Sequence, residues 1–275
     1  MTTTDAVRTE MIATAASYVD ALVSHDSASV RFADDVRRLG NGTTLLQGAA
    51  DLRAVIEREP VAAIEHVRWV VEPPHVAAVY DLEADMTRAQ QSDTFAPRES
   101  WIPAYIAERF TVVDGLITEI DVVYAAAEPG RPRPARPDRY PSAAGPSAPA
   151  RAVVVDAARA YLDALVSHDG SNVPLAPQAW RVENGRGSGD SGPEIAAALA
   201  SEIMHVVAGV RDELWIVEDD TAVVFYTLDV DLGRLPNAPS DAPKRAKRLG
   251  ERFRVVDGMV AEIEAVIPAE DIAPS

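Results

Sequence analysis

The chain of 275 residues contains no cysteine, and only Lys244 and Lys247 among its 26 basic residues are lysines. The absence of cysteine excludes disulfides, thiolate nucleophiles and cysteine-ligated metals. No apolar run approaches the roughly 18 residues of a membrane-spanning helix, and the first residues lack the pattern of a secretory signal. These absences favour a cytoplasmic protein, and the scarcity of lysine beside many alanines and arginines favours a bacterial origin.

Several functional signatures are also missing. The sequence has no glycine-rich phosphate loop, no serine-centred nucleophile elbow and no metalloprotease motif. Its histidines and carboxylates show no metal-ligand spacing, so we predict no metal and no cofactor. Acidic residues outnumber basic ones by 43 to 26, and the formal net charge of −17 disfavours binding to nucleic acid or to membrane surfaces.

What the chain does contain is a duplication. The string YVDALVSHD at residues 18–26 returns as YLDALVSHD at 161–169, and ERFTVVDGLITEI at 108–120 returns as ERFRVVDGMVAEI at 251–263. Both pairs are offset by 143 residues (161 − 18 and 251 − 108). The offset is far longer than the roughly 20 to 50 residues of a solenoid repeat, so a whole domain is duplicated.

The domain boundaries follow from this offset. We predict a first repeat at residues 1–127 and a second at 151–275. Residues 128–150 are rich in proline, alanine and arginine, which disfavours helix or central strand and favours a semi-extended linker.

Each repeat begins with a predicted amphipathic helix. Its inward face carries Met11, Ala15, Tyr18, Leu22 and His25 in repeat one, and Val154, Ala158, Tyr161, Leu165 and His168 in repeat two. Asp26 and Asp169 follow as predicted caps of a short second helix. A short strand ending in Asn-Gly comes next, at 36–42 and 180–185, and then a third helix at 49–58 and 193–204.

The remainder of each repeat alternates as strands do. In the strand at 76–86, even-numbered apolar residues oppose an acidic stripe of Asp81, Glu83 and Asp85, and in repeat two Asp229 and Asp231 form the matching stripe. Asp-Gly pairs at 114–115 and 257–258 predict the final hairpins. Loops at 87–98 and 236–248 interrupt the sheets as possible lids. Helices on one face of a curved antiparallel sheet make an α+β cone with a cavity that suits a small ligand.

This element order, the helix string YVDALVSHD, the ENG motif at 183–185 and the closing ERFRVVDGMVAEIE resemble the SnoaL-like branch of the nuclear transport factor 2-like (cystatin-like α+β) superfamily. The resemblance covers nearly all of both repeats and implies two tandem cones. It implies no single activity, because that superfamily includes cyclases, isomerases, hydrolases, dehydratases and non-catalytic binders. Repeat one departs from the pattern, with GNG at 40–42 in place of ENG.

Two residues of repeat two are candidate catalytic groups. The resemblance implies that a tyrosine on the first helix donates a hydrogen bond to a ligand, which selects Tyr161 and, in repeat one, Tyr18. Glu183 ends the first strand and is a candidate general base if burial raises its pKa. A core role for the tyrosines and an exposed position for Glu183 are the alternatives.

Further candidate ligand contacts have equally simple structural interpretations. Tyr80 and Tyr226 lie on inward strand faces, Asn41 and Asn184 occupy the Asn-Gly turns, and His168 ends a helix whose dipole favours it there. Helix geometry separates His168 from the adjacent Asp169, so a catalytic dyad is not predicted. Arg109 and Arg252, repeated in the ERF strings, are interpreted as cross-strand ion pairs, with anchoring of an anionic ligand as the alternative.

We therefore predict a protein that binds a small apolar molecule in a cone, with or without acid–base isomerase, dehydratase or cyclase chemistry. The alternative is a non-catalytic binding or scaffold protein in which the two domains pair within one chain. A homodimer is also compatible with the sequence. The ligand and the reaction are not encoded in any motif.

Overall fold

The computed structural model describes residues 3–85, 101–127, 149–239 and 241–269. The chain divides into two compact units, unit 1 (Met1–Pro132) and unit 2 (Arg133–Ser275). Most of the predicted linker, residues 128–148, and the predicted lid at 87–98 lie outside the described residues. In the described part, no helix is long and apolar enough to cross a membrane.

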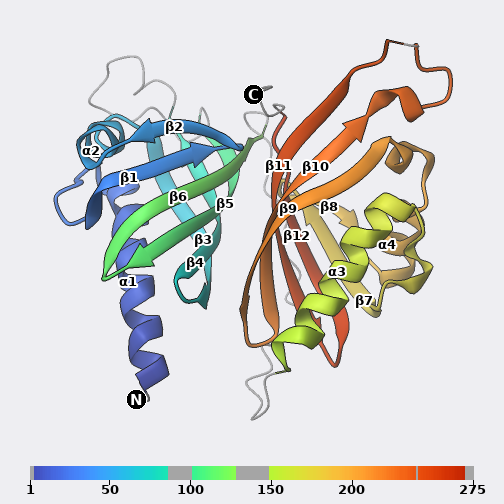
Figure 1. Cartoon of the computed structure of the whole chain (residues 1–275), viewed down its shortest axis with the longest axis horizontal. Coiled ribbons are helices and arrows are strands. Elements are labelled where there is room, and N and C mark those ends of the chain that lie inside the picture. Colours follow the sequence, from blue (N-terminus) through green and yellow to red (C-terminus); the bar gives the residue numbers. More distant parts are fainter. Residues whose placement is uncertain (1–2, 86–100, 128–148, 240, 270–275) are drawn as a thin grey trace. The chain divides into compact units, whose positions relative to one another are not determined.

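Unit 1 is one sheet with helices against one face (Figure 1). The sheet order is β2-β1-β6-β5-β4-β3. Its elements are α1 (Thr3–Ser24), β1 (Phe32–Gly40), β2 (Thr43–Gln47), α2 (Ala49–Ile56), β3 (Val61–Glu72), β4 (His75–Ala84), β5 (Ile102–Val113) and β6 (Leu116–Ala126).

Unit 2 repeats this order and also contains three short 3₁₀ turns, and its sheet order is β8-β7-β12-β11-β10-β9. Its elements are α3 (Arg151–Ser167), η3 (Gly170–Asn172), β7 (Leu175–Glu183), β8 (Arg186–Gly189), α4 (Gly192–Leu199), η4 (Glu202–Val206), β9 (Val207–Glu218), β10 (Thr221–Asp231), η5 (Leu232–Arg234), β11 (Lys244–Val256) and β12 (Met259–Val266). The predicted fold class, two tandem α+β units, is confirmed.

One strand pairing in each unit differs from the prediction of an antiparallel sheet. β1 runs parallel to β6, and β7 runs parallel to β12, whereas the other pairs are antiparallel. In unit 1 the β1–β2 hairpin is followed by α2, and the chain then crosses to β3 at the far edge of the sheet and returns through β4 and β5 to β6. Unit 2 follows the same path through α4 to β9 and back to β12. The last strand therefore arrives beside the first in the same direction.

The turns form where the sequence predicts them. Asn41, Asn184, Asp114 and Asp257 all have positive φ, and each is followed by a glycine with positive φ. This backbone is the one that two-residue hairpins require, and Asn, Asp and Gly adopt it at low cost.

The predicted helices and strands differ from the structure mainly at their ends. The third helix is shorter than predicted in both units, because α2 ends at Ile56 and the 3₁₀ turn η4 follows α4. Asp169 caps η3, whereas Asp26 accepts a bond from the backbone N–H of Ala28 in a turn without a helix. The predicted loop 236–248 is shorter, since β11 begins at Lys244.

The helix-facing sides of the sheets form two separate cores. Most of the predicted inward residues of α1, β4, α3 and β10 are buried there, including all four tyrosines Tyr18, Tyr80, Tyr161 and Tyr226. His25, His168, Leu228 and Val230 are only half-buried. Asp81, predicted on an exposed stripe, is instead buried, and its Oδ2 lies 2.9 Å from Nδ1 of His66. A register shift in β3 with a positive φ at His66 aims that imidazole at Asp81.

Candidate functional site

Unit 2 contains a cavity of about 230 Å³ between its helices and the concave side of its sheet. For comparison, an apolar cavity of about 150 Å³ accommodates benzene. Most of the wall is apolar, and it is formed by Leu165, Ile195, Ala198, Leu199, Ile203, Met204, Val206, Val207, Leu228, Val230, Leu249 and Ile267. Polar side chains also line it: Tyr161, Arg181, Glu183, Tyr226 and Glu251. An apolar enclosure with a few convergent polar groups is the usual form of a small-molecule site.

Glu251 and Tyr226 form the most deeply buried polar pair of this cavity. Each residue is about 1% exposed, and the Tyr226 hydroxyl donates a 3.0 Å hydrogen bond to Oε2 of Glu251. Val224 stands directly opposite Glu251 in the β10–β11 register, so Glu251 and Tyr226 occupy adjacent positions on the inward face. The sheet itself therefore fixes the geometry of the pair.

Burial raises the pKa of Glu251 to about 7, although the positive charge of Arg181 and the hydrogen bond from Tyr226 both oppose the rise. Desolvation disfavours the carboxylate because it loses its hydration in the apolar surroundings. Burial likewise raises the pKa of Tyr226 and of Tyr161 above 10, so both phenols stay protonated near neutral pH. The cavity thus combines one carboxyl that can gain or lose a proton with two neutral hydroxyl donors.

Arg181 carries the fixed positive charge of the site. Its Nη1 donates to Oε2 of Glu183 at 2.9 Å and to Oγ of Ser188 at 2.7 Å. Its Nε is buried and has no hydrogen-bond partner among the described residues. Glu183 is held by this ion pair at the edge of the cavity, where 40% of its side chain is exposed.

The structure brings some of the predicted site residues together. Tyr161, Tyr226 and Glu183 all line the unit 2 cavity. Sequence reasoning did not select Glu251 or Arg181. A signal existed for Glu251, because it lies two residues from the core residue Phe253 on one strand and therefore on the same face.

Other predicted contacts serve the fold. The side-chain amide of Asn184 donates to the carbonyl oxygen of Ile267 at 2.8 Å and accepts from the Ile267 N–H at 2.8 Å. Asn41 makes the same pair of contacts with Tyr124, at 3.4 and 3.0 Å. His168 is the left-handed C-cap of α3, its Nε2 lies 3.2 Å from the carbonyl oxygen of Val207, and its ring lies 4.7 Å from that of His205.

Unit 1 repeats the buried polar set with Tyr18, Arg38, Tyr80 and Glu108. The Tyr80 hydroxyl donates a 2.7 Å hydrogen bond to Oε2 of Glu108, and burial raises the pKa of Glu108 to about 7. Arg38 pairs with Glu59, because Gly40 occupies the position that Glu183 has in unit 2. The Tyr18 hydroxyl and Oε1 of Glu108 are buried without a hydrogen-bond partner among the described residues.

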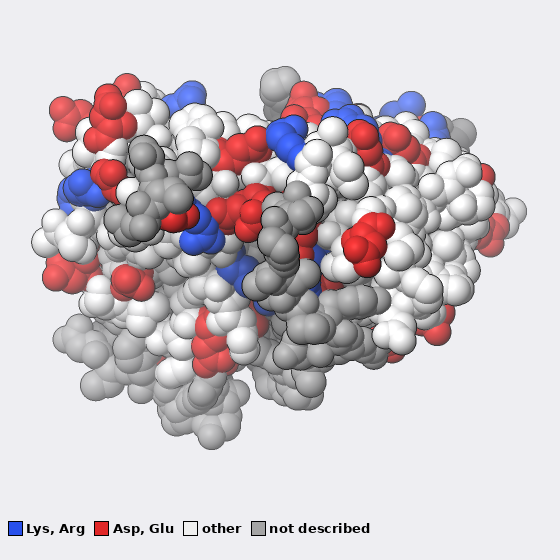
Figure 2. Space-filling view, turned by 90° about the horizontal axis from the view of Figure 1, so that it is seen from below, with Lys and Arg blue, Asp and Glu red and all other residues white. Residues whose placement is uncertain are grey.

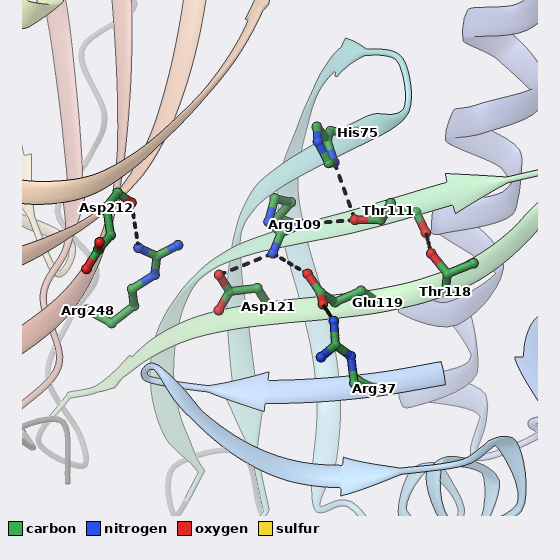
Figure 3. Close-up of polar contacts among 9 residues, drawn as sticks. All are labelled: Arg37, His75, Arg109, Thr111, Thr118, Glu119, Asp121, Asp212 and Arg248. Atoms are coloured by element: carbon green, nitrogen blue, oxygen red, sulfur yellow. Dashed lines mark hydrogen bonds and ion pairs between the residues drawn. The ribbon is translucent and has the colours of Figure 1, made fainter. Parts of the chain in front are cut away.

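The arginines of the two ERF strings lie on the other side of the sheet from these glutamates. Arg109 contacts Glu119 at 2.7 Å and Asp121 at 3.5 Å on the neighbouring strand (Figure 3). Arg252 contacts Glu262 at 3.0 Å and Glu264 at 3.9 Å in the same way. The predicted cross-strand ion pairs are confirmed. Among the described residues, no group of three or more His, Asp or Glu side chains is placed to hold a metal ion.

Fold and site together define a tandem pair of small α+β domains, each with a Tyr–Arg–Tyr–Glu set in which the tyrosines and the glutamate are buried and the arginine is partly exposed. A family model described as Domain of unknown function (DUF8021) matches residues 4–124 and again residues 147–267. The chain belongs to this family and contains its domain twice, at the offset of 143 residues (147 − 4) read from the sequence. A comparison with curated proteins found no match.

Two of the solved structures that are similar to this chain each cover less than half of it. An epoxide hydrolase described as LEH-like from M. tuberculosis is 18% identical, covers 43% of this chain and 85% of its own, and has a TM-score of 0.37. A putative SnoaL-like polyketide cyclase from Jannaschia Sp. CCS1 is 17% identical, covers 45% and 90%, and has a TM-score of 0.36.

Proposed function

We propose that unit 2 binds a small, largely apolar molecule with one oxygen function and moves a proton on it by acid–base chemistry. The observation that carries the proposal is the position of Glu251, whose pKa is about 7, in an apolar cavity of about 230 Å³ beside two protonated tyrosines. A general base works best when its pKa is close to the working pH.

The side chains divide the work in this proposal. The Glu251 carboxylate takes a proton from a carbon next to a ligand carbonyl and returns it at another position. The Tyr161 hydroxyl and the Arg181 guanidinium stabilise the negative charge that develops on the ligand oxygen. Isomerisation, dehydration and aldol-type cyclisation all share this proton transfer, and the apolar wall excludes water from it.

Glu183 supports a different assignment of the base, because it also lines the cavity. Its ion pair with Arg181 and its 40% exposed side chain are better suited to holding the guanidinium in place than to removing a proton. In our proposal Glu183 is therefore a positioning residue and Glu251 is the catalytic base.

Matched substitutions test this assignment. With a ligand that wild-type protein turns over, Glu251→Gln is expected to lower kcat by at least about a hundredfold, the usual size of a general-base contribution. The unit 1 control Glu108→Gln, which changes the same kind of buried pair, is expected to leave kcat within about twofold. Loss of activity in Glu183→Gln with retention in Glu251→Gln would instead make Glu183 the base.

A non-catalytic binding protein is the second candidate. The observation in its favour is that the buried Tyr–Glu pair is present in both units, which also suits a purely structural role. Ligand binding that is unchanged by Glu251→Gln, without turnover in either protein, would favour this candidate.

A further inference from the structure

The segment between the second helix and the next strand is longer in unit 2 than in unit 1. The helix ends at Ile56 and at Leu199, which are offset by 143 residues (199 − 56). The strand begins at Val61 and at Val207, which are offset by 146 (207 − 61). Unit 2 therefore has three additional residues here, and its longer segment forms η4. The residues of η4 that line the unit 2 cavity are Ile203, Met204 and Val206.

The matching segment of unit 1 is charged and closes on the arginine of that unit. Residues 57–60 read EREP, and Glu59 forms an ion pair with Arg38. In unit 2 the corresponding Arg181 pairs with Glu183, which lies on the same strand. The segment after the unit 2 helix does not supply this carboxylate, and it contributes only apolar side chains to the cavity wall.

Contacts with two helices hold η4 at the cavity. The ring of His205 lies 4.7 Å from the ring of His168, which is the C-cap of α3. Nε2 of His168 lies 3.2 Å from the carbonyl oxygen of Val207, the residue that follows η4. On the other side, the Ser201 hydroxyl donates a 2.6 Å hydrogen bond to the carbonyl oxygen of Ala198 in α4. The apolar side chains of η4 therefore belong to a wall that is supported from both ends.

The cavity is polar where it is buried and apolar where it meets solvent. Glu251 and Tyr226 are about 1% exposed, whereas Ile203 is 64% exposed, the largest value for a large apolar side chain among the described residues. Apart from the Arg181–Glu183 ion pair, the other lining residues that solvent reaches are also apolar: Ala198, Met204, Val206, Leu228, Val230 and Ile267. This is the reverse of the usual arrangement, in which apolar groups are buried and polar groups face water.

The buried end is suited to a neutral oxygen function. Arg181 is already paired with Glu183 at 2.9 Å, and an ionised Glu251 would repel a second carboxylate. The formal net charge of −17, with acidic side chains over much of the face shown in Figure 2, also disfavours an anionic ligand. A carbonyl oxygen can instead accept a hydrogen bond from the Tyr161 hydroxyl without adding charge.

We propose that the ligand of unit 2 is a neutral ketone or aldehyde with a long apolar tail, which binds with its oxygen at the buried end and its tail across Ile203. The inference rests on the proposed function and adds the substrate class and the role of η4. On β10 the cavity wall extends from Tyr226 to Val230, four residues and about 13 Å at the usual strand rise. A zigzag chain of about ten carbons, with bonds of roughly 1.5 Å, covers this length.

A homologous series of ketones separates the tail from the oxygen end. Methyl butyl ketone has one more heavy atom than benzene and is short enough to stay inside the cavity, and methyl hexyl and methyl octyl ketone extend its tail toward η4. In titration calorimetry with the full chain, wild-type protein is expected to gain about tenfold in affinity for each added pair of carbons, because each buried CH₂ contributes roughly fourfold.

Ile203→Ser tests whether η4 binds the tail. The variant is expected to bind methyl butyl ketone as wild type does and to gain only about threefold for each added pair of carbons, because the tail loses its apolar contact. The matched control is Val153→Ser on α3, which removes an apolar side chain that is 43% exposed and lies outside the cavity lining. The control is expected to keep the gain of wild type.

Tyr161→Phe tests the orientation of the ligand. It is expected to weaken the binding of all three ketones by the same factor, about fivefold, because one hydrogen bond to the carbonyl oxygen is lost. Unchanged affinities in Tyr161→Phe would overturn the proposed orientation.

The same gain with chain length in Ile203→Ser as in wild type would overturn the inference, and so would an equal loss for all three ketones. In both cases binding of methyl butyl ketone would leave the proposed cavity function standing. Failure of wild-type protein to bind any of the three ketones would contradict both.

Discussion

Glu251 and Glu108 are carboxyl groups that the fold removes from water. Each is about 1% exposed, and each accepts a hydrogen bond from a tyrosine on the neighbouring strand. Burial is the main cause of their raised pKa, and the arginine of each set limits the rise. At the residue scale these groups are costly to ionise, which is a property that an acid–base site requires.

The raised pKa of Glu251 has a measurable effect on stability. An unfolded glutamate loses its proton near pH 4.5, whereas folded Glu251 keeps its proton up to about pH 7. The unfolded state therefore binds fewer protons than the folded state in this window, and this group destabilises the fold as pH rises through it. Protonated Glu251 therefore stabilises the fold most below about pH 4.5, and this stabilisation is lost by about pH 8.

Glu251→Gln is expected to abolish that dependence. The unfolding free energy of the variant relative to wild type should rise by up to about 3 kcal/mol between about pH 4 and pH 8, because burial raises the pKa of Glu251 from 4.5 to about 7. Denaturant unfolding of both proteins at a series of pH values measures it. Parallel profiles would mean that Glu251 titrates as an exposed glutamate does.

The sequence predicts the inward position of some site residues but not of others. Tyr161 and Tyr18 are predicted as inward-facing because helix periodicity is a strong local signal, and both are buried. Glu251 was missed because glutamate beside arginine on a strand suggests an exposed ion pair. Its burial depends on long-range packing against Tyr226, although its spacing from Phe253 indicated the correct face.

At the scale of elements, the Asn-Gly turns join the first and last strands of each unit. Asn184 follows β7 and binds both main-chain groups of Ile267 just beyond β12. Because Ile267 also lines the cavity, this contact supports the wall of the site. The parallel β7–β12 pairing is thus continued by a side chain where the strand ladder ends.

Asn184→Gly removes these two hydrogen bonds and still permits the positive φ at that position. The expected cost is about 1–3 kcal/mol of unfolding free energy, because each net hydrogen bond contributes about 1 kcal/mol. Chemical denaturation of the variant measures it, and Asn41→Gly is the matched change in unit 1. An unchanged unfolding midpoint would show that the contact with Ile267 does not stabilise the unit.

The hairpins and the amphipathic helices were predictable because their signals are local: Asn-Gly and Asp-Gly dipeptides, and spacings of two and of three to four residues. The parallel pairing of β1 with β6 was not, since it joins strands at opposite ends of a repeat. The contact of Asp81 with His66 was also not predictable, because it forms at a register shift in β3.

At the scale of the whole molecule, duplication was followed by divergence. Both units keep the Tyr–Arg–Tyr–Glu set, but Glu183 is found in unit 2, where unit 1 has Gly40. We infer a division of labour in which unit 2 binds the ligand.

Pairing of the two units within one chain remains a prediction from the sequence. It predicts a compact scattering profile in solution for the monomeric chain. An extended profile with two separate maxima in the distance distribution would contradict it, and a molecular mass of twice the chain would indicate a homodimer.

The central claim is that unit 2 encloses a ligand cavity. Its most direct test is a thermal-shift screen of wild-type protein and of Leu228→Trp, which places a larger side chain against the cavity, with steroids, terpenoids, aromatic polyketides and carboxylic acids. A ligand at about 100 times its Kd stabilises wild type by roughly 2.7 kcal/mol. We predict a shift in wild type that Leu228→Trp abolishes. A shift of equal size in both proteins, or none in wild type, would contradict the claim.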